Sequence, residues 1–257
     1  MTSSAPSSEL GRVRGFLSAF HRRQAARTVD FPGGFAALDD AYRLSRGNNH
    51  LLVDGSVAPE ALPGHAEEAM GHLPYRHAYV LDETVAAACR EPMERAGFRH
   101  STSLAMTHTG PVPEHGGARE VGLDELRGPA TASWDRFAPG AAAEQVRDMV
   151  ERRAARLRGA DDVRFFAAHT PAGEVAAWVD LYADPSTGVA QIEDLVTAEA
   201  HLGRGYAGVV LDTALHEAAA AGCALRFLTA RPADWPHRWY GRKGFEVVGT
   251  LTRFERV

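Results

Sequence analysis

The chain has little cysteine, almost no lysine and no long apolar run. Its 257 residues include 2 cysteines, Cys89 and Cys223, which lie far apart and outside any metal-ligand spacing. We expect both to be buried small hydrophobic residues, and we expect no bound metal. No apolar segment approaches the roughly 20 residues of a membrane helix, and the start of the chain lacks the charged and apolar regions of a signal peptide. These absences predict a cytoplasmic protein.

A strong excess of one charge is also missing. The formal net charge is -5, Lys243 is the only lysine, and no basic run forms a local patch. We therefore expect neither nucleic acid nor a membrane as a partner.

One stretch has the pattern of a strand, a glycine loop and a helix. Residues 189–196 are rich in branched side chains, the loop at 201–208 holds three glycines, and residues 209–221 have helical composition. Glycines let backbone N–H groups turn toward one point, and a helix N-terminus adds unpaired N–H groups and the positive end of its dipole. This arrangement is typical of a phosphate site.

These residues resemble a known family. Gly203-x-Gly205-x-Ala207 after an apolar strand, followed downstream by Tyr240 and then Gly244-Phe245, is similar to the GCN5-related N-acetyltransferase (GNAT) superfamily. The family's loop usually reads Arg or Gln, two variable residues, Gly, one variable residue, then Gly or Ala. Leu202 stands at the first of these places and is a departure, although Arg204 and the backbone donors remain.

The resemblance implies acetyl-CoA as cosubstrate and a set of contacts to it. The pantetheine arm lies along the backbone of the strand before the loop, the phosphates lie on the loop, and a further contact lies near the thiol. In this chain the matching residues are Leu195, Val196 and Thr197, then Leu202, Gly203, Arg204, Gly205, Tyr206, Ala207 and Gly208, and finally Asp234. Asp234 is equally well placed to cap the helix that carries Tyr240.

Acetyl transfer from a thioester to an amine needs an acid and a base. The resemblance makes Tyr240 the general acid, since a phenol with a pKa of about 10 is protonated at neutral pH. Strand alternation places Glu193 and Asp194 on opposite faces, so only one can serve as the base. We prefer Glu193, with Asp194 as the second candidate.

The domain organisation expected from the sequence is tandem. Residues 1–8 form a disordered tail, 9–112 a degenerate acetyltransferase-like domain, and 113–257 the acetyl-CoA-binding catalytic domain. The first copy has a fainter Gly97-Phe98 signature and no Gly-x-Gly loop between Val53 and Glu83. The implied fold class is α/β, with a mixed, mostly antiparallel sheet flanked by helices, in two tandem copies. Residues 36–44 suggest a short helix, and 245–248 and 250–254 suggest two final strands.

Two functions follow from different classes. The first is an N-acetyltransferase that acts on the primary amine of a small molecule, as a monomer or homodimer. The alternative is a non-catalytic CoA-binding or interaction module, which Leu202 and the degenerate first half favour.

Overall fold

The computed structural model describes residues 8–257, which form two compact units. The first unit contains residues 8–107 and 229–257, and the second contains residues 108–228. The tail expected at residues 1–8 lies outside the described residues except for Ser8, whose Oγ accepts a hydrogen bond from the N–H of Gly11 at the start of the first helix. The domain boundary expected between residues 112 and 113 stays a prediction.

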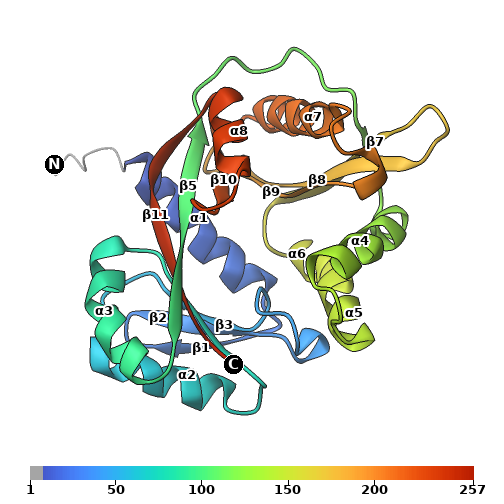
Figure 1. Ribbon diagram of the computed structural model, residues 1–257. Helices are drawn as coiled ribbons and strands as arrows, with labels where there is room; N and C mark the ends of the chain where they lie inside the picture. Colours follow the sequence, from blue (N-terminus) through green and yellow to red (C-terminus); the bar gives the residue numbers. More distant parts are fainter. Residues whose placement is uncertain (1–7) are drawn as a thin grey trace, which may run out of the picture. The chain divides into compact units, whose positions relative to one another are not determined.

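The first unit is a mixed sheet with helices on both faces (Figure 1). Its strands run in the order β1-β2-β3-β4-β11-β5, with β3 parallel to β4 and β11 antiparallel to β4. Its elements are α1 (Glu9–Gln24), β1 (Arg27–Phe31), β2 (Gly34–Leu38), η1 (Asp40–Tyr42), β3 (His50–Val53), η2 (Pro59–Ala61), α2 (Leu62–Met70), β4 (Arg76–Val80), α3 (Glu83–Arg95), β5 (Arg99–His108), α8 (Pro236–Arg242) and β11 (Phe245–Arg256).

Strand alternation divides this sheet into two packed faces. Leu51 and Val53 of β3 and Ala78 and Val80 of β4 pack with the apolar residues of α2 and α3. On α1, a buried stripe that includes Val13, Leu17 and Phe20 recurs at helical spacing and faces the protein interior. Cys89 lies in the α3 core and is a free, buried thiol, as is Cys223, which confirms the expectation for both cysteines.

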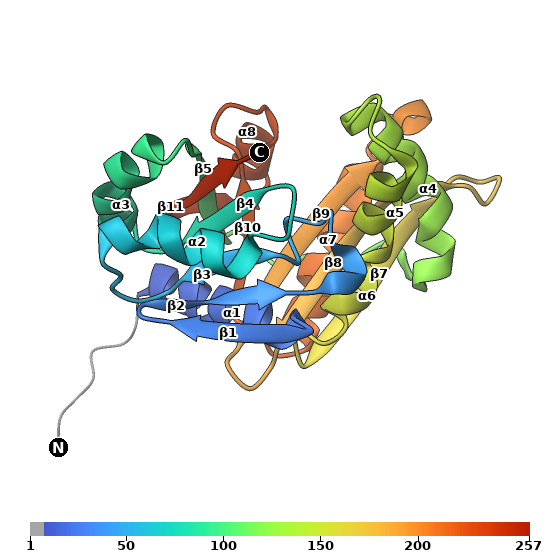
Figure 2. The ribbon, with the colours of Figure 1, turned by 90° about the horizontal axis from the view of Figure 1, so that it is seen from below.

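The second unit is a mainly antiparallel sheet in the order β10-β9-β8-β7-β6. α7 packs against β7, β8 and β9, and α4 and α5 lie on the other side of these strands (Figure 2). Its elements are β6 (Arg119–Glu120), α4 (Leu123–Phe137), α5 (Ala143–Glu151), α6 (Arg153–Arg156), β7 (Asp162–His169), β8 (Val175–Asp184), β9 (Val189–Thr197), η3 (Glu199–His201), α7 (Tyr206–Ala220) and β10 (Leu225–Ala230), whose last two residues belong to the first unit.

The segment that enters the second unit is fastened to α7. The N–H groups of Gly117 and Ala118 both donate to Thr213 Oγ1, at 3.1 and 3.0 Å. A side chain at Gly116 would collide with Thr213, so only glycine permits this approach.

Two expectations about local structure are wrong. Residues 36–44 are not one helix, because Phe35 to Ala37 pair with β3 on one side and β1 on the other, and only the 3₁₀ turn η1 at Asp40–Tyr42 is helical. The final strands are one strand, β11, which continues through Gly249. A Cβ on Gly249 would lie 2.5 Å from the side chain of Leu10, so this glycine permits the approach of α1 rather than a turn.

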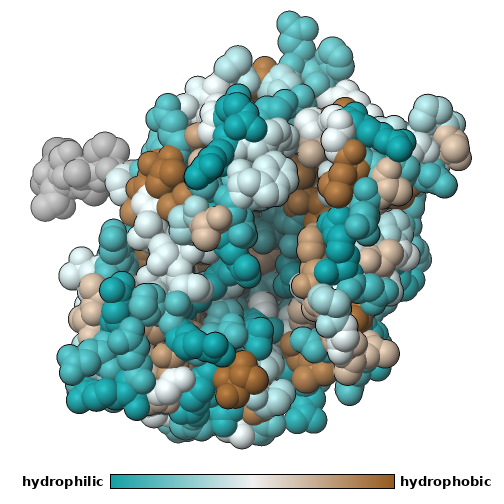
Figure 3. All heavy atoms as spheres, viewed as in Figure 1, coloured by the Kyte–Doolittle hydropathy of each residue, from teal (hydrophilic) through white to brown (hydrophobic). Residues whose placement is uncertain are grey.

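Hydrophobic residues on the face drawn in Figure 3 are scattered among hydrophilic ones and form no single large patch. Among residues 8–257, no helix combines the length and the apolar character that a membrane crossing requires. Over the same range, no group of three or more His, Cys, Asp or Glu side chains has the arrangement of a metal site.

Two buried histidines lie on the α1 face of the first sheet. The Nδ1 atoms of His50 and His77 lie 3.2 and 3.3 Å from the carbonyl oxygen of Arg46, which can only accept. Nδ1 of each ring therefore carries a proton, and Nε2 of His50 is buried without a hydrogen-bond partner in the described part of the chain. Burial lowers the pKa of His50 from 6.5 to about 4, since a charged ring cannot be solvated there and Arg253 adds repulsion.

This burial predicts acid sensitivity. Because the pKa of His50 is near 4 in the folded state and 6.5 in the unfolded state, protons bind first to the unfolded chain as the pH falls. The free energy of unfolding should be constant above pH 6.5 and decrease by about 3 kcal/mol between pH 6.5 and 4 from this group alone. Chemical denaturation across this pH range measures the slope.

The matched variants are His50→Asn, which retains a donor near the Nδ1 position, and His115→Asn at an exposed site. The first should flatten the slope even if it lowers stability at neutral pH, and the second should leave the slope unchanged. An equal slope in the wild type and His50→Asn would contradict the account.

Candidate functional site

The loop before α7 is built for an anion. Gly203 and Gly205 have φ values of 74° and 86°, which residues with side chains rarely adopt. A Cβ on either glycine would point into open space, so it is the backbone conformation that demands glycine there. Gly205 is the N-cap of α7, and no side chain caps the helix.

Backbone donors at this helix end are available. Within the described residues, no acceptor pairs with the N–H groups of Tyr206 and Ala207, whereas the N–H of Gly208 already donates to Gly205 O. The first N–H groups of a helix require partners, and the dipole of a 15-residue helix favours a negative one. Arg204 is exposed beside them. These features fit a phosphate group.

Leu202 occupies the place where the family pattern has a polar residue. Its side chain is 53% exposed at the entrance to the loop. The neighbouring His201 is buried and faces Glu174 at 3.5 Å and the ring of Tyr206 at 6.0 Å between centroids. Leu202 therefore contributes no polar contact, and the N–H groups carry the site.

β9 separates from β10 immediately before the loop. The parallel register joins Val189 to Leu225 and Gln191 to Phe227 and ends there. From Ile192 to Thr197, β9 has β8 as its only strand partner in the described part of the chain. The backbone of Leu195, Val196 and Thr197 thus has one edge without a strand, and these residues are half-buried. An extended arm that pairs like a strand fits this edge.

A β-bulge interrupts β9 on its other edge. Trp178 pairs with Val196 and Asp180 pairs with Glu193, so β9 contains one residue more than β8 over this interval. Asp194 is the bulged residue and has a φ of 47°, which makes it the only non-glycine residue with positive φ among those described. That conformation costs about 1 kcal/mol in a residue with a Cβ.

The bulge corrects the expectation that Glu193 and Asp194 face opposite sides. Glu193 accepts a hydrogen bond from Gln191 Nε2 at 2.7 Å, as expected for residues two apart on one face. Asp194, however, binds Arg153 and Arg156, which also bind Asp180, the register partner of Glu193. Both carboxylates therefore lie on the same side of the sheet, the side that α6 covers.

Asp194 is held as a carboxylate. Its Oδ2 accepts hydrogen bonds from Arg153 Nη2 at 2.9 Å and Arg156 Nη1 at 2.7 Å. Burial alone would raise the pKa of Asp194, but Arg156, Arg153 and Arg152 outweigh it and hold the pKa well below its usual range. A group with so low a pKa is a weak base.

The sequence analysis missed this cluster of charged side chains. Asp180 is fully buried and accepts from Arg153, Arg156 and the hydroxyl of Tyr182. It lies in the middle of β8, whose only other acid is its last residue, Asp184. An acid in the middle of an apolar run and arginines at spacing i and i+3 were the available signals. Neither signal shows that Asp180 pairs with Arg153 and Arg156, because β8 and α6 are separated in the sequence.

Tyr240 and Asp234 belong to the first compact unit. Tyr240 is half-buried in α8, with ring centroids 5.2 Å from Trp239 and 5.8 Å from Phe245. Asp234 is exposed and does not cap α8, whose N-cap is Trp235 without a side-chain hydrogen bond. The capping alternative is thus excluded, and the catalytic role of Tyr240 stays a prediction.

Comparisons with known proteins agree with this geometry. The model of the acetyltransferase (GNAT) family matches residues 130–245. Sequence comparison with curated proteins gave no match.

Solved structures share the fold over nearly the whole chain. A GCN5-related N-acetyltransferase from Kribbella flavida is 18% identical, with a TM-score of 0.63, and the match covers 98% of this chain and 96% of that one. A functionally unknown conserved protein from Staphylococcus epidermidis is 13% identical, with a TM-score of 0.63, and the match covers 89% of this chain and 92% of that one. A GCN5-related N-acetyltransferase from Sphaerobacter thermophilus is 16% identical, with a TM-score of 0.56, and the match covers 98% of this chain and 94% of that one.

The predicted fold class is confirmed by these neighbours. The glycine loop, the separated strand and the family model all fall in one stretch of the sequence. Residues 130–245 therefore form a domain of the GNAT acetyltransferase family.

Proposed function

We propose that this protein transfers the acetyl group of acetyl-CoA to the primary amine of a small molecule. The observation that carries the proposal is the pair of unpaired N–H groups at the start of α7, beside a strand whose backbone has a free edge. A phosphate anchor and an adjacent extended edge suit a ligand with a pyrophosphate and a long amide-containing arm.

Acetyl-CoA fits these residues by chemistry. Residues 203–208 would hold the phosphates through N–H groups, with Arg204 adding a positive charge, and Leu195, Val196 and Thr197 would pair with the arm. Asp234 remains a candidate contact near the thiol through the family resemblance alone. When bound, the thioester supplies an acyl carbon that an amine can attack.

Two residues of the chain would then act as the general base and the general acid. Glu193 would accept the proton that the amine loses as its nitrogen bonds to the acyl carbon, and Tyr240 would donate a proton to the sulfur as the C–S bond breaks. We retain Glu193 as the base because two guanidinium groups hold Asp194 as a carboxylate and lower its pKa, which makes Asp194 the weaker base.

The first unit is proposed to be a degenerate copy that binds no cofactor. Its parallel strands β3 and β4 stay paired to their ends, with Val53 opposite Val80 and the N–H of Leu81 donating to Val53 O at 3.0 Å. Within the described residues of the first unit, β3 and β4 offer no free edge that corresponds to that of β9. α2 begins at Leu62-Pro63 rather than at a glycine loop.

The remaining expectations stay predictions. These are the small-molecule acceptor, the absence of nucleic acid and membrane partners, a monomeric or homodimeric state and a cytoplasmic location. The fold does not identify the amine, because proteins that share a fold differ in the residues that bind the acceptor.

The phosphate site predicts the effect of a charge at Gly205. Gly205→Glu should raise the Kd for acetyl-CoA on the order of 100-fold or more, since the carboxylate would face the phosphates. Gly222→Glu is the matched control, because Gly222 has a φ of 84° and open space at the opposite end of α7. Calorimetric titration measures the Kd of both variants for acetyl-CoA. If Gly205→Glu binds acetyl-CoA as tightly as Gly222→Glu, the phosphates do not lie at this loop.

The acid and base roles predict distinct pH profiles. Glu193→Gln and Tyr240→Phe should each reduce turnover by about 10²- to 10⁴-fold with little change in the Kd for acetyl-CoA. The first should remove the rise in turnover on the acidic side, and the second the fall on the alkaline side. The exposed Glu199→Gln is the control for charge removal and should behave as wild type. A residue whose variant keeps full turnover at every pH has no part in the mechanism.

A further inference from the structure

The bulge in β9 requires a support that the strand itself does not supply. Asp194 has a φ of 47°, in a region that residues with a Cβ rarely occupy. Such a conformation persists only where the surroundings fix it. The residues around Asp194 show what does so.

Two arginines from one short helix hold the carboxylate. Asp194 Oδ2 receives Arg153 Nη2 at 2.9 Å and Arg156 Nη1 at 2.7 Å, and Arg152 Nη2 lies 3.5 Å away. The side chains of Arg153 and Arg156 are only 5% and 7% exposed, so solvent screens these pairs little.

The same arginines are anchored on the neighbouring strand. Asp180 of β8 accepts from Arg153 Nε at 3.2 Å and from Arg156 Nη1 at 2.7 Å, and the Tyr182 hydroxyl donates to Asp180 at 2.8 Å. Burial raises the pKa of Tyr182, which keeps the hydroxyl protonated and able to donate. The arginines thus join β8 to the bulge of β9 from one side of the sheet.

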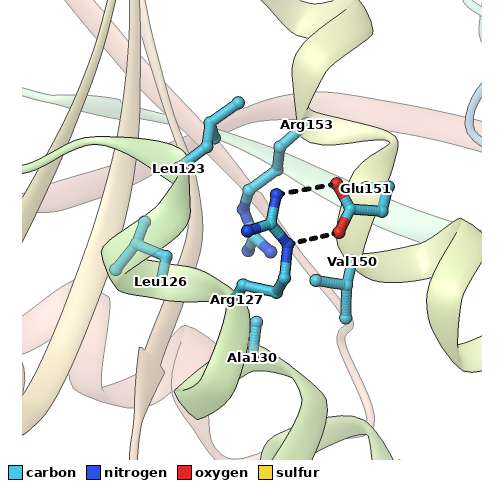
Figure 4. A pocket seen from close by; sticks show the side chains of 7 residues that line it. All are labelled: Leu123, Leu126, Arg127, Ala130, Val150, Glu151 and Arg153. Atoms are coloured by element: carbon cyan, nitrogen blue, oxygen red, sulfur yellow. Dashed lines mark hydrogen bonds and ion pairs between the residues drawn. The ribbon is translucent and has the colours of Figure 1, made fainter.

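The helices around Arg153 are packed rather than open. Arg127 of α4 binds Glu151 of α5 through two contacts, at 2.5 and 3.3 Å, and lies beside Arg153 (Figure 4). The cavity that these residues line measures about 10 Å³, which leaves no room for a substrate group. The cluster therefore supports the strand and is not itself a binding pocket.

We propose that Asp194 is a positioning residue rather than the catalytic base, and that its ion pairs with Arg153 and Arg156 fix the β9 bulge. The bulge sets the direction of the backbone from Glu193 to Thr197. This inference rests on the proposed function for its consequence: the fixed backbone presents its free edge to the cofactor arm and places Glu193 on the α6 side of the sheet. The residues that bind Asp194 or its arginine partners affect catalysis only by holding Asp194 in place; these are Arg153, Arg156, Asp180 and Tyr182.

The test compares three substitutions at one position. Asp194→Asn, Asp194→Gly and Asp194→Ala all remove the charge, but glycine adopts a positive φ without cost and asparagine adopts it readily, whereas alanine does not. If the bulge is what matters, the Kd for acetyl-CoA should be about tenfold higher in the alanine variant than in the glycine variant. Turnover of Asp194→Asn at saturating acetyl-CoA should stay within a few-fold of wild type, with an unshifted pH profile.

Two outcomes would overturn the proposal. A loss of turnover in Asp194→Asn comparable to that of Glu193→Gln, with acetyl-CoA affinity intact, would make Asp194 the base. Equal affinities in the glycine and alanine variants would show that the bulge conformation does not set binding.

A measurement without ligand separates this proposal from the proposed function. Hydrogen exchange of the peptide that covers residues 192–197 should be fastest in Asp194→Ala and slower in the asparagine and glycine variants. If wild type does not bind acetyl-CoA, the proposed function fails, and the order of exchange rates still decides whether Asp194 fixes the bulge. If Asp194→Ala does not fold, the asparagine and glycine variants are compared with wild type: faster exchange in both supports the ion pairs as what fixes the bulge, and exchange at the wild-type rate overturns the proposal.

Discussion

Among the described residues, the second half of β9 has a strand partner on one edge only, and the proposed acetyl transfer depends on that constraint. Backbone N–H and C=O groups need partners when they are removed from water, and β10 stops pairing with β9 at Gln191. The edge from Ile192 to Thr197 is therefore prepared for an extended ligand. The glycine loop and the start of α7 follow directly in the chain and add donors for an anion. In the proposed function, one short stretch of sequence thus supplies both the site for the arm and the site for the phosphates.

The contrast with the first unit shows how little change removes such a site. β3 and β4 have the same parallel relation as β9 and β10, but their pairing continues to the carboxyl ends, where the N–H of Leu81 reaches Val53. With that edge closed, the described part of the first unit keeps the strand, helix, strand arrangement but has no glycine loop before α2, so it lacks the two features that we propose hold CoA. Its buried histidines serve a different purpose, since they fill the space between α1 and the sheet as neutral rings.

Local signals in the sequence predicted the loop and its helix, because glycine conformation and helix ends are set by neighbouring residues. The strand at residues 189–196 followed from the same kind of pattern, and the α/β fold followed from the family resemblance. Three features depended on distant partners and were not predictable. The alanine-rich residues 34–38 are a strand because β1 and β3 flank them, and Gly249 lies within a strand because α1 packs closely there. The bulge at Asp194 depends on register with β8 and on arginines from α6.

We propose that one unit of this chain binds acetyl-CoA and the other does not, and calorimetric titration of the full chain with acetyl-CoA tests this proposal. We expect saturable binding in the micromolar range with one site per chain, because the phosphate-binding loop and the free strand edge act together. No detectable binding, or two sites per chain, would contradict it.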